Sequence, residues 1–251
     1  HVELPRKVVK ACRRAGIARL LHMSANGADP LGPSLYQQTK GLGARIVREA
    51  GEPRTASTGM GWLNGPKMTQ AEALDATLFE PSIVFGNGDS FFTRFARLVR
   101  RTPLGFPLAR ADTRFAPVWV EDVAAAFARA VAEPRTFGQT YTLCGPHEYT
   151  FADLVRIVID LQGLSRQVWP LPGWAARLQA EILERVPGKP MTTDQLRSLA
   201  WDNTCDGPFP EVFGIEPQAL EAVVPTYVGD RERPMEDLYQ YRARARRDDH
   251  S

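Results

Sequence analysis

The sequence has few cysteines and no long apolar run. Its three cysteines, Cys12, Cys144 and Cys205, stand far apart among 251 residues. They have neither the Cys-x-x-Cys spacing nor the paired histidines of a zinc site, and they do not suggest a disulfide framework. We therefore expect buried thiols in a reducing compartment. No stretch of about 18 apolar residues and no charged-then-apolar leader is present, so neither a transmembrane segment nor a signal peptide is predicted.

Neither sign of charge dominates. The chain has 31 Lys and Arg against 29 Asp and Glu, a net charge of +2, which is too weak for nucleic acid, whose binding requires a concentrated basic face. Hydrophobic residues make up 43% and charged residues 24%, as in average soluble globular proteins. The composition therefore excludes a disordered chain and allows a sizeable core in one large or two small domains.

Short apolar strands alternate with amphipathic helices. Residues 4–16 place apolar side chains at steps of three and four, which predicts a helix that ends at a glycine. The run IARLLHMS (17–24) is too short for a helix and predicts a buried strand. Residues 34–50 predict a second helix, and residues 73–86 the next strand, stopped by Pro81. Such alternation is typical of βαβ units and parallel sheets.

The second half continues this pattern. Residues 91–101 predict a helix, as do residues 122–133, whose first turn Asp122 can cap. The run TYTLCGP predicts another strand, and Thr150 is expected to cap the helix that follows it. Beyond that helix, short helices over 174–185 and 193–201 alternate with proline-rich connections.

Three polar residues can carry chemistry. Ser24 ends the first strand, and Tyr36 and Lys40 lie one helical turn apart on one helix face. A nearby ammonium favours the phenolate and so lowers the tyrosine pKa from its reference value near 10. Tyr36 can then act as a general acid or base toward a carbonyl or alcohol whose oxygen Ser24 holds. Tyr-x-x-x-Lys alone is more often a solvated pair, but the flanking strands make this instance more specific.

Histidine and tryptophan residues offer weaker candidates. His22 lies in an apolar strand without a histidine or carboxylate cluster, so we expect a packed side chain rather than a metal ligand. Trp169, Trp174 and Trp201 are expected to pack in the core, and the alternative is that they line an apolar substrate pocket.

Several blocks of the sequence resemble an atypical extended short-chain dehydrogenase/reductase of the NAD-dependent epimerase/dehydratase family. They are similar to bacterial relatives of the NADPH-binding accessory subunit of mitochondrial respiratory complex I. The resemblance extends from Val2 to about Val228. Its blocks are LLHMSANGADPLGPSLYQQTKGLGARIVREAG, LDATLFEPSIVFGNGDSFF, FAPVWVEDVAAAFARAV, GQTYTLCGPHEYTFADLV and NTCDGPFPEVFGIEP.

This resemblance implies an α/β fold: a Rossmann-type parallel sheet, lacking its first strands, with a smaller C-terminal α+β region. It also implies NADP or NAD as cofactor, a respiratory or quinone-related membrane complex as a further partner, and a cytoplasmic location with peripheral membrane association as an alternative. Lys40 is expected to bond the nicotinamide ribose. The matching positions are Ser24, Tyr36 and Lys40 for catalysis, and Tyr36, Lys40, Pro81, Ser82, Ile83 and Val84 for the cofactor.

The sequence departs from the family at three places. The Gly-x-x-Gly-x-x-Gly turn that receives the pyrophosphate at a helix N-terminus is absent. Glu80 stands where relatives commonly place Arg, so a reversed charge is expected beside the cofactor. Residues 52–73 form an inserted loop where relatives connect helix and strand directly. Because the chain also begins with His1 rather than Met, we expect an N-terminal truncation and poor NAD(P)H binding by this chain alone.

The expected organisation has three parts. Residues 1–150 are the C-terminal part of an NAD(P)-binding Rossmann domain, and residues 151–228 are a smaller substrate or lid region. Residues 229–251 have few apolar side chains and are expected to be flexible.

Three functions are consistent with these features. The leading hypothesis is an NAD(P)H-binding protein of the accessory-subunit-like branch, in which the nucleotide stabilises the fold or an assembly. The alternative is an active NAD(P)-dependent oxidoreductase or epimerase/dehydratase that uses Ser24, Tyr36 and Lys40 on a carbonyl or alcohol. A third class is an interaction module without nucleotide.

Overall fold

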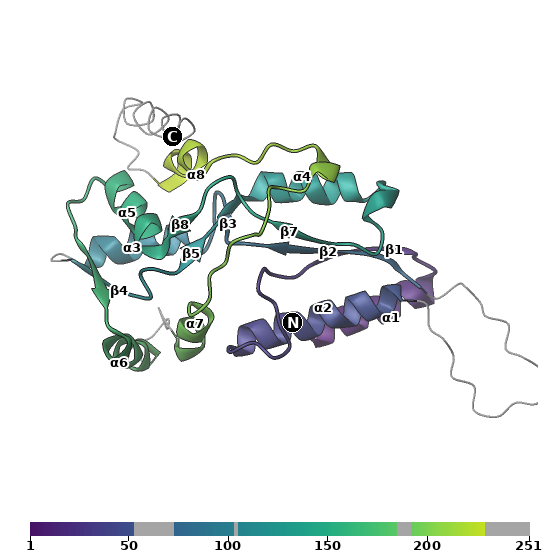
Figure 1. The fold of residues 1–251 in the computed structure, drawn as a ribbon, viewed down its shortest axis with the longest axis horizontal. Helices are drawn as coiled ribbons and strands as arrows, with labels where there is room; N and C mark the ends of the chain where they lie inside the picture. Colours follow the sequence, from purple (N-terminus) through teal and green to yellow (C-terminus); the bar gives the residue numbers. More distant parts are fainter. Residues whose placement is uncertain (53–72, 103–104, 185–191, 229–251) are drawn as a thin grey trace, which may run out of the picture.

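The computed structural model describes residues 1–52, 73–102, 105–184 and 192–228 (Figure 1). The predicted flexible tail and nearly all of the predicted inserted loop lie outside these ranges. The helices are α1 (Glu3–Ala15), α2 (Leu35–Gly51), α3 (Phe92–Arg101), α4 (Val120–Ala130), α5 (Phe151–Leu161), α6 (Gly173–Glu184), α7 (Thr193–Ser198), α8 (Leu220–Val223) and α9 (Pro225–Val228). The strands are β1 (Arg19–Met23), β2 (Asp75–Pro81), β3 (Val84–Phe85), β4 (Phe106–Ala109), β5 (Arg114–Phe115), β6 (Val118–Trp119), β7 (Thr140–Leu143), β8 (Tyr149–Thr150) and β9 (Val168–Leu171).

A three-stranded parallel sheet forms the centre of the fold. Its order is β1-β2-β7, with Leu21 opposite Thr77 and Phe79 opposite Tyr141. Helices α1 and α2 cover one face and α4 covers the other (Figure 1). Successive side chains of β2 point to opposite faces of the sheet. Leu78 packs in a hydrophobic cluster with α1 and α2, whereas Phe79 packs in a cluster with α4 on the other face. The predicted α/β class with a parallel sheet is confirmed.

Local signals fix several helix ends. Gly16 ends α1 in the left-handed conformation, at φ 66°, which glycine adopts without steric cost. The Ser34 hydroxyl accepts a hydrogen bond from the Gln37 backbone N–H at the start of α2. Thr150 forms the predicted cap of α5 as part of a capping box with Asp153. These helices begin or end within about two residues of the predicted positions, because caps are short-range interactions.

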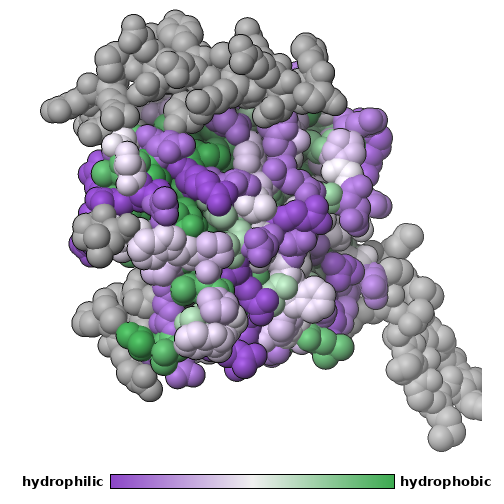
Figure 2. All heavy atoms as spheres, turned by 60° about the vertical axis from the view of Figure 1, so that its left-hand side comes forward, coloured by the Kyte–Doolittle hydropathy of each residue, from purple (hydrophilic) through white to green (hydrophobic). Residues whose placement is uncertain are grey.

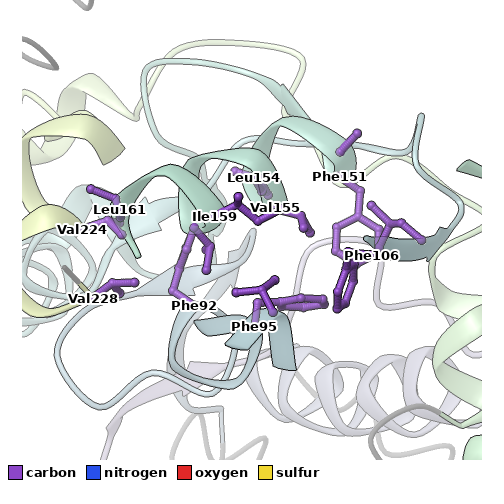
Figure 3. Packing of buried hydrophobic residues seen from close by; sticks show 14 of the residues in the cluster. Phe92, Phe95, Phe106, Phe151, Leu154, Val155, Ile159, Leu161, Val224 and Val228 are labelled. Atoms are coloured by element: carbon purple, nitrogen blue, oxygen red, sulfur yellow. The ribbon is translucent and has the colours of Figure 1, made fainter. Parts of the chain in front are cut away.

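A second, aromatic core lies beside the sheet. Helices α3 and α5 pack together with the strand pairs β4–β9 and β5–β8, and with α8 and α9. Figure 3 shows phenylalanines of α3 and β4 facing α5 across this core. The cluster combines residues from before and after position 150. Its labelled members are Phe92, Phe95, Phe106, Phe151, Leu154, Val155, Ile159, Leu161, Val224 and Val228.

The burial of strand β1 and the start of helix α4 differ from the predictions. Strand β1 was predicted to be buried, but its first four residues are half-buried and Met23 is 50% exposed. The reason is that β1 has only β2 as a neighbour among the described strands. Asp122 does not cap α4, because the helix begins earlier, at Val120. Its buried carboxylate instead accepts a hydrogen bond of 2.8 Å from the Gln218 backbone N–H.

The three tryptophans are exposed, so the prediction of core packing and its pocket alternative are both wrong. Trp169, Trp174 and Trp201 are 46%, 74% and 63% exposed, and none lines the main cavity described below. Helix α6 buries the side that carries Ala176 and Ala180, which turns Trp174 outward. On the face shown in Figure 2, hydrophobic residues form separate green patches between hydrophilic ones.

The cysteine prediction is wrong for two of the three residues. Cys144 and Cys205 form a disulfide with a Cα–Cα distance of 6.1 Å, whereas Cys12 is a buried free thiol. The chain brings the pair together because Gly145, after β7, and Asn203 both bond to the backbone of Ala116. A separation of 61 residues gave no sign of this proximity.

Candidate functional site

The main cavity lies where strands β1 and β2 end and helix α2 begins. It has a volume of about 710 Å³, and ligands of open parallel α/β sheets bind at this carboxyl edge. The backbone continues the sheet beyond β1, since the N–H groups of Ser24 and Asn26 donate to the carbonyls of Phe79 and Pro81. All seven residues singled out from the sequence line the cavity: Ser24, Tyr36, Lys40, Pro81, Ser82, Ile83 and Val84.

Ser24 has an unused hydrogen-bonding group. The residue is 3% exposed, and its buried hydroxyl oxygen has no hydrogen-bond partner among the described residues. Buried hydroxyls in native proteins are almost always paired. An unpaired one in a cavity wall is suited to a ligand oxygen, because the ligand then removes the cost of the unmade bond.

Lys40 is bound to the end of strand β1. Its ammonium donates to the carbonyl oxygens of Met23 at 3.4 Å and Ser24 at 3.2 Å. Burial lowers the pKa of Lys40 below its ordinary value. These two bonds fix the side chain against the strand, on the same cavity wall as the Ser24 hydroxyl.

Tyr36 is a neutral phenol at neutral pH. Partial burial raises its pKa above the ordinary value of 10, and no charged group offsets this effect. The predicted lowering of this pKa by Lys40 is therefore wrong, since the Lys40 ammonium is engaged by strand carbonyls instead. The His1 ring packs edge-on against Tyr36 with centroids 5.8 Å apart. In this arrangement Tyr36 is a proton donor.

His22 and Glu80 do not line the cavity. His22 is half-buried, and burial together with the charge of Lys40 lowers its pKa. No group of three metal-ligating side chains occurs within the described ranges.

Glu80 lies 3.7 Å from Arg48 of α2. Burial raises the Glu80 pKa and Arg48 partly opposes this shift. Glu80 is therefore paired with α2 and stands outside the cavity lining.

A segment from the C-terminal region closes one side of the cavity. The Asn26 amide donates to the Asn203 side-chain oxygen at 3.0 Å and to the Thr204 carbonyl at 2.8 Å. The Ser82 hydroxyl donates to the Asn203 carbonyl at 2.8 Å. Cys205, the next residue, is tied to the end of β7 by the disulfide. Sequence reasoning missed Asn26 and Asn203, although both stand in blocks that carry the family resemblance.

Helix α7 holds the first turn of α2. The Asp194 carboxylate accepts hydrogen bonds from the backbone N–H groups of Leu35 at 2.7 Å and Tyr36 at 3.2 Å. The Ser198 hydroxyl donates to that of Ser34 at 2.8 Å. A carboxylate at a helix N-terminus satisfies free N–H groups and interacts favourably with the helix dipole. Sequence reasoning missed this contact, because Asp194 lies more than 150 residues along the chain.

Aromatic side chains and one arginine complete the cavity wall. Phe91 and Phe95 of the α3 region and Phe151 of α5 line it together with Arg94. Arg94 is exposed and has no hydrogen-bond or ion-pair partner within the described part of the chain. The site thus combines an apolar wall with an unused hydroxyl, a phenol and a free guanidinium.

Comparison with known proteins supports the resemblance seen in the sequence. No protein-family model matches the chain. It is 26% identical over 228 residues to mitochondrial NADH dehydrogenase (ubiquinone) 1 alpha subcomplex subunit 9 of Rattus norvegicus, covering 88% of this chain and 53% of that protein. It is 24% identical over 222 residues to the mitochondrial NADH-ubiquinone oxidoreductase 40 kDa subunit of Neurospora crassa, covering 86% and 52%. The chain spans about half the length of these relatives.

Solved structures share the fold. A nucleoside-diphosphate-sugar epimerase from Staphylococcus aureus matches with a TM-score of 0.61 at 15% identity, over 91% of this chain and 71% of that one. UDP-glucuronic acid 4-epimerase from Bacillus cereus, solved with UDP-glucuronic acid and NAD, matches with a TM-score of 0.53 at 14% identity, over 90% and 66%. The predicted Rossmann-type fold is confirmed.

The residues present fit one end of a nicotinamide dinucleotide. The orphaned Ser24 hydroxyl, the Lys40 ammonium and the 81–84 segment surround a cavity at the correct edge of the sheet. The sequence contains no glycine-rich turn to receive the pyrophosphate.

Among the described helices, none has the length and apolar content needed to cross a bilayer.

Proposed function

We propose that this chain supplies the nicotinamide side of an NAD(P) site in a protein like the accessory subunit of NADH dehydrogenase. The observation that carries the proposal is the position of Ser24, Tyr36 and Lys40 beside residues 81–84 on one cavity at the carboxyl edge of a parallel sheet. The similarity over 88% of the chain supports the same conclusion. In this role the nucleotide stabilises the fold or an assembly.

Named residues would hold the nicotinamide end. Lys40 would bond the ribose with the part of its donor capacity that the carbonyls of Met23 and Ser24 leave unused. The segment from Pro81 to Val84 would lie along the ring. The adenosine half would find no phosphate-binding turn in this sequence, so it would add little affinity.

This difference between the two ends leads to a direct test. Reduced nicotinamide mononucleotide and NADPH are titrated separately into the chain and followed by nicotinamide fluorescence. We expect the two ligands to bind this chain with dissociation constants within about threefold, in the millimolar range typical of small polar ligands. Lys40→Met weakens both by roughly tenfold, the value of a charged hydrogen bond. Lys10→Met on α1, which does not line the cavity, leaves both dissociation constants unchanged.

Two results contradict the proposal. Absence of binding of both ligands at tens of millimolar would remove the nicotinamide site. Binding of NADPH a hundredfold or more tighter than the mononucleotide would show a pyrophosphate site that the sequence lacks.

The geometry also supports a second candidate, an active oxidoreductase or epimerase/dehydratase. A bound NAD(P)H would supply a hydride to the substrate, and a bound NAD(P)+ would accept one from it. The observation in favour is that the unused Ser24 hydroxyl and the neutral Tyr36 phenol line the same cavity. Ser24 would donate a hydrogen bond to a substrate carbonyl oxygen, and Tyr36 would donate its proton to the same oxygen as charge develops there. Asp194 would hold the turn that carries Tyr36.

A respiratory membrane complex is the proposed partner. The support is the similarity to subunits named for NADH dehydrogenase (ubiquinone) and NADH-ubiquinone oxidoreductase. The test is co-migration of the protein with such a complex on a native gel of mildly solubilised membranes. Migration of all the protein as a free species would contradict this partner.

A further inference from the structure

The cavity wall built by α3 and α5 is aromatic. The ring centroids of Phe91 lie 4.9 Å from Phe95 and 5.8 Å from Phe151, and those of Phe95 and Phe151 are 5.4 Å apart. Phe95 and Phe151 are 9% and 2% exposed, whereas Phe91 is only half-buried. Phe91 therefore offers ring surface to the cavity while the other two hold it in place.

Most polar side chains of the cavity are already engaged within the protein. Asn26 and Asn203 bond to each other, and Ser82 bonds to the Asn203 carbonyl. Asp194 caps α2, and Gln195 forms a capping box with Thr192. A sugar ring needs a hydrogen-bond partner for each buried hydroxyl. With these side chains committed, the wall favours a ligand with few polar groups.

Four polar side chains of the cavity lining make no hydrogen bond within the described ranges: Ser24, Tyr36, Ser90 and Arg94. Arg94 follows Phe91 by three residues, so the two side chains lie about one turn apart at the start of α3, and both line the cavity. Its guanidinium has no partner within the described ranges, and its planar fork matches a carboxylate. The Ser24 hydroxyl and the Tyr36 phenol stand at the sheet edge of the same cavity.

We propose that this cavity takes a planar apolar ring that carries a carboxylate and a carbonyl or hydroxyl oxygen. The ring lies against Phe91, the carboxylate pairs with Arg94, and the remaining oxygen meets Ser24 and Tyr36. The inference rests on the proposed function in placing the reacting oxygen at Ser24. The packing of the ring against Phe91 and the pairing of its carboxylate with Arg94 do not require a bound nicotinamide nucleotide. The volume of about 710 Å³ lies within the range of small-molecule sites.

The test uses 4-acetylbenzoate as the probe and 4-acetylbenzamide as its uncharged counterpart, titrated without nucleotide and followed by calorimetry. We expect the wild-type chain to bind the acid at least tenfold more tightly than the amide. Arg94→Gln abolishes this preference. Arg97→Gln, one turn along α3 and outside the cavity lining, retains it. Both arginines are exposed, so neither change threatens folding.

Two further measurements locate the ring and the oxygen. Phe91→Ala weakens both probes to a similar extent, because the lost contact is with the ring. Ser24→Ala weakens 4-acetylbenzoate but leaves benzoate, which lacks the acetyl oxygen, unchanged.

Three outcomes overturn the inference: equal binding of acid and amide, an Arg97→Gln effect as large as that of Arg94→Gln, or tighter binding of UDP-glucose than of 4-acetylbenzoate. Because these titrations contain no nicotinamide nucleotide, their failure leaves the result with reduced nicotinamide mononucleotide intact. Failure of mononucleotide binding likewise leaves the ring site standing.

Discussion

The Cys144–Cys205 disulfide provides a quantitative test of the structure. It joins the end of β7 to the segment that carries Asn203 and Thr204, across 61 residues of sequence. In the chain-entropy description, a cross-link over a loop of this length lowers the entropy of the unfolded chain by about 14 cal/mol/K, or roughly 4 kcal/mol at 25 °C. We expect Cys205→Ser to lower the free energy of unfolding by this amount at most.

Urea denaturation followed by circular dichroism measures the loss, with and without a phosphine reductant. The wild-type chain is expected to lose stability when reduced, whereas Cys205→Ser has the same stability in both conditions. Cys12→Ala is the matched control, since it removes the free thiol and keeps the response to reductant. Thiol titration of the unreduced, denatured wild-type chain should find one thiol. Three thiols, or a Cys205→Ser variant as stable as the oxidised wild type, would refute the reasoning.

Three further predictions test the cap of α5, the half-buried His22 and the Tyr36 phenol. Thr150→Ala removes the capping box of α5 and should lower the free energy of unfolding by about 1 kcal/mol in urea denaturation. Thr226→Ala, at an exposed position of α9 that makes no cap, should cost less than half of that, and equal losses would contradict the cap. The pKa of His22 is lowered by burial, so the unfolded chain binds a proton more readily and the free energy of unfolding should fall as pH drops through about 6.5. His22→Asn should flatten this fall and His147→Asn should not, and the reverse pattern would contradict it. Under the enzyme alternative, Tyr36→Phe should reduce turnover at least about a hundredfold, as for loss of a general acid, while mononucleotide binding by fluorescence stays unchanged; an unaltered rate eliminates Tyr36 as the acid.

The predicted site residues illustrate how far sequence pattern reaches. Ser24, Tyr36 and Lys40 line one cavity, as expected, because Ser24 follows the end of β1 and residues four apart share a helix face. The chemical state of Tyr36 was predicted wrongly. It depends on what surrounds the phenol and on which carbonyls hold the ammonium, and both depend on packing.

The sequence by itself determined the alternation of strands and helices, the caps at Gly16 and Thr150, and the one-turn spacing of Tyr36 and Lys40. These features depend on residues within a few positions of each other, where backbone geometry fixes the outcome. Only the tertiary structure decided the disulfide, the Asp194 contact with the start of α2, the closure of the cavity by Asn203, and the exposure of the tryptophans. Each of these follows from packing between segments distant in sequence, and the spacing of residues along a chain carries no information about such contacts.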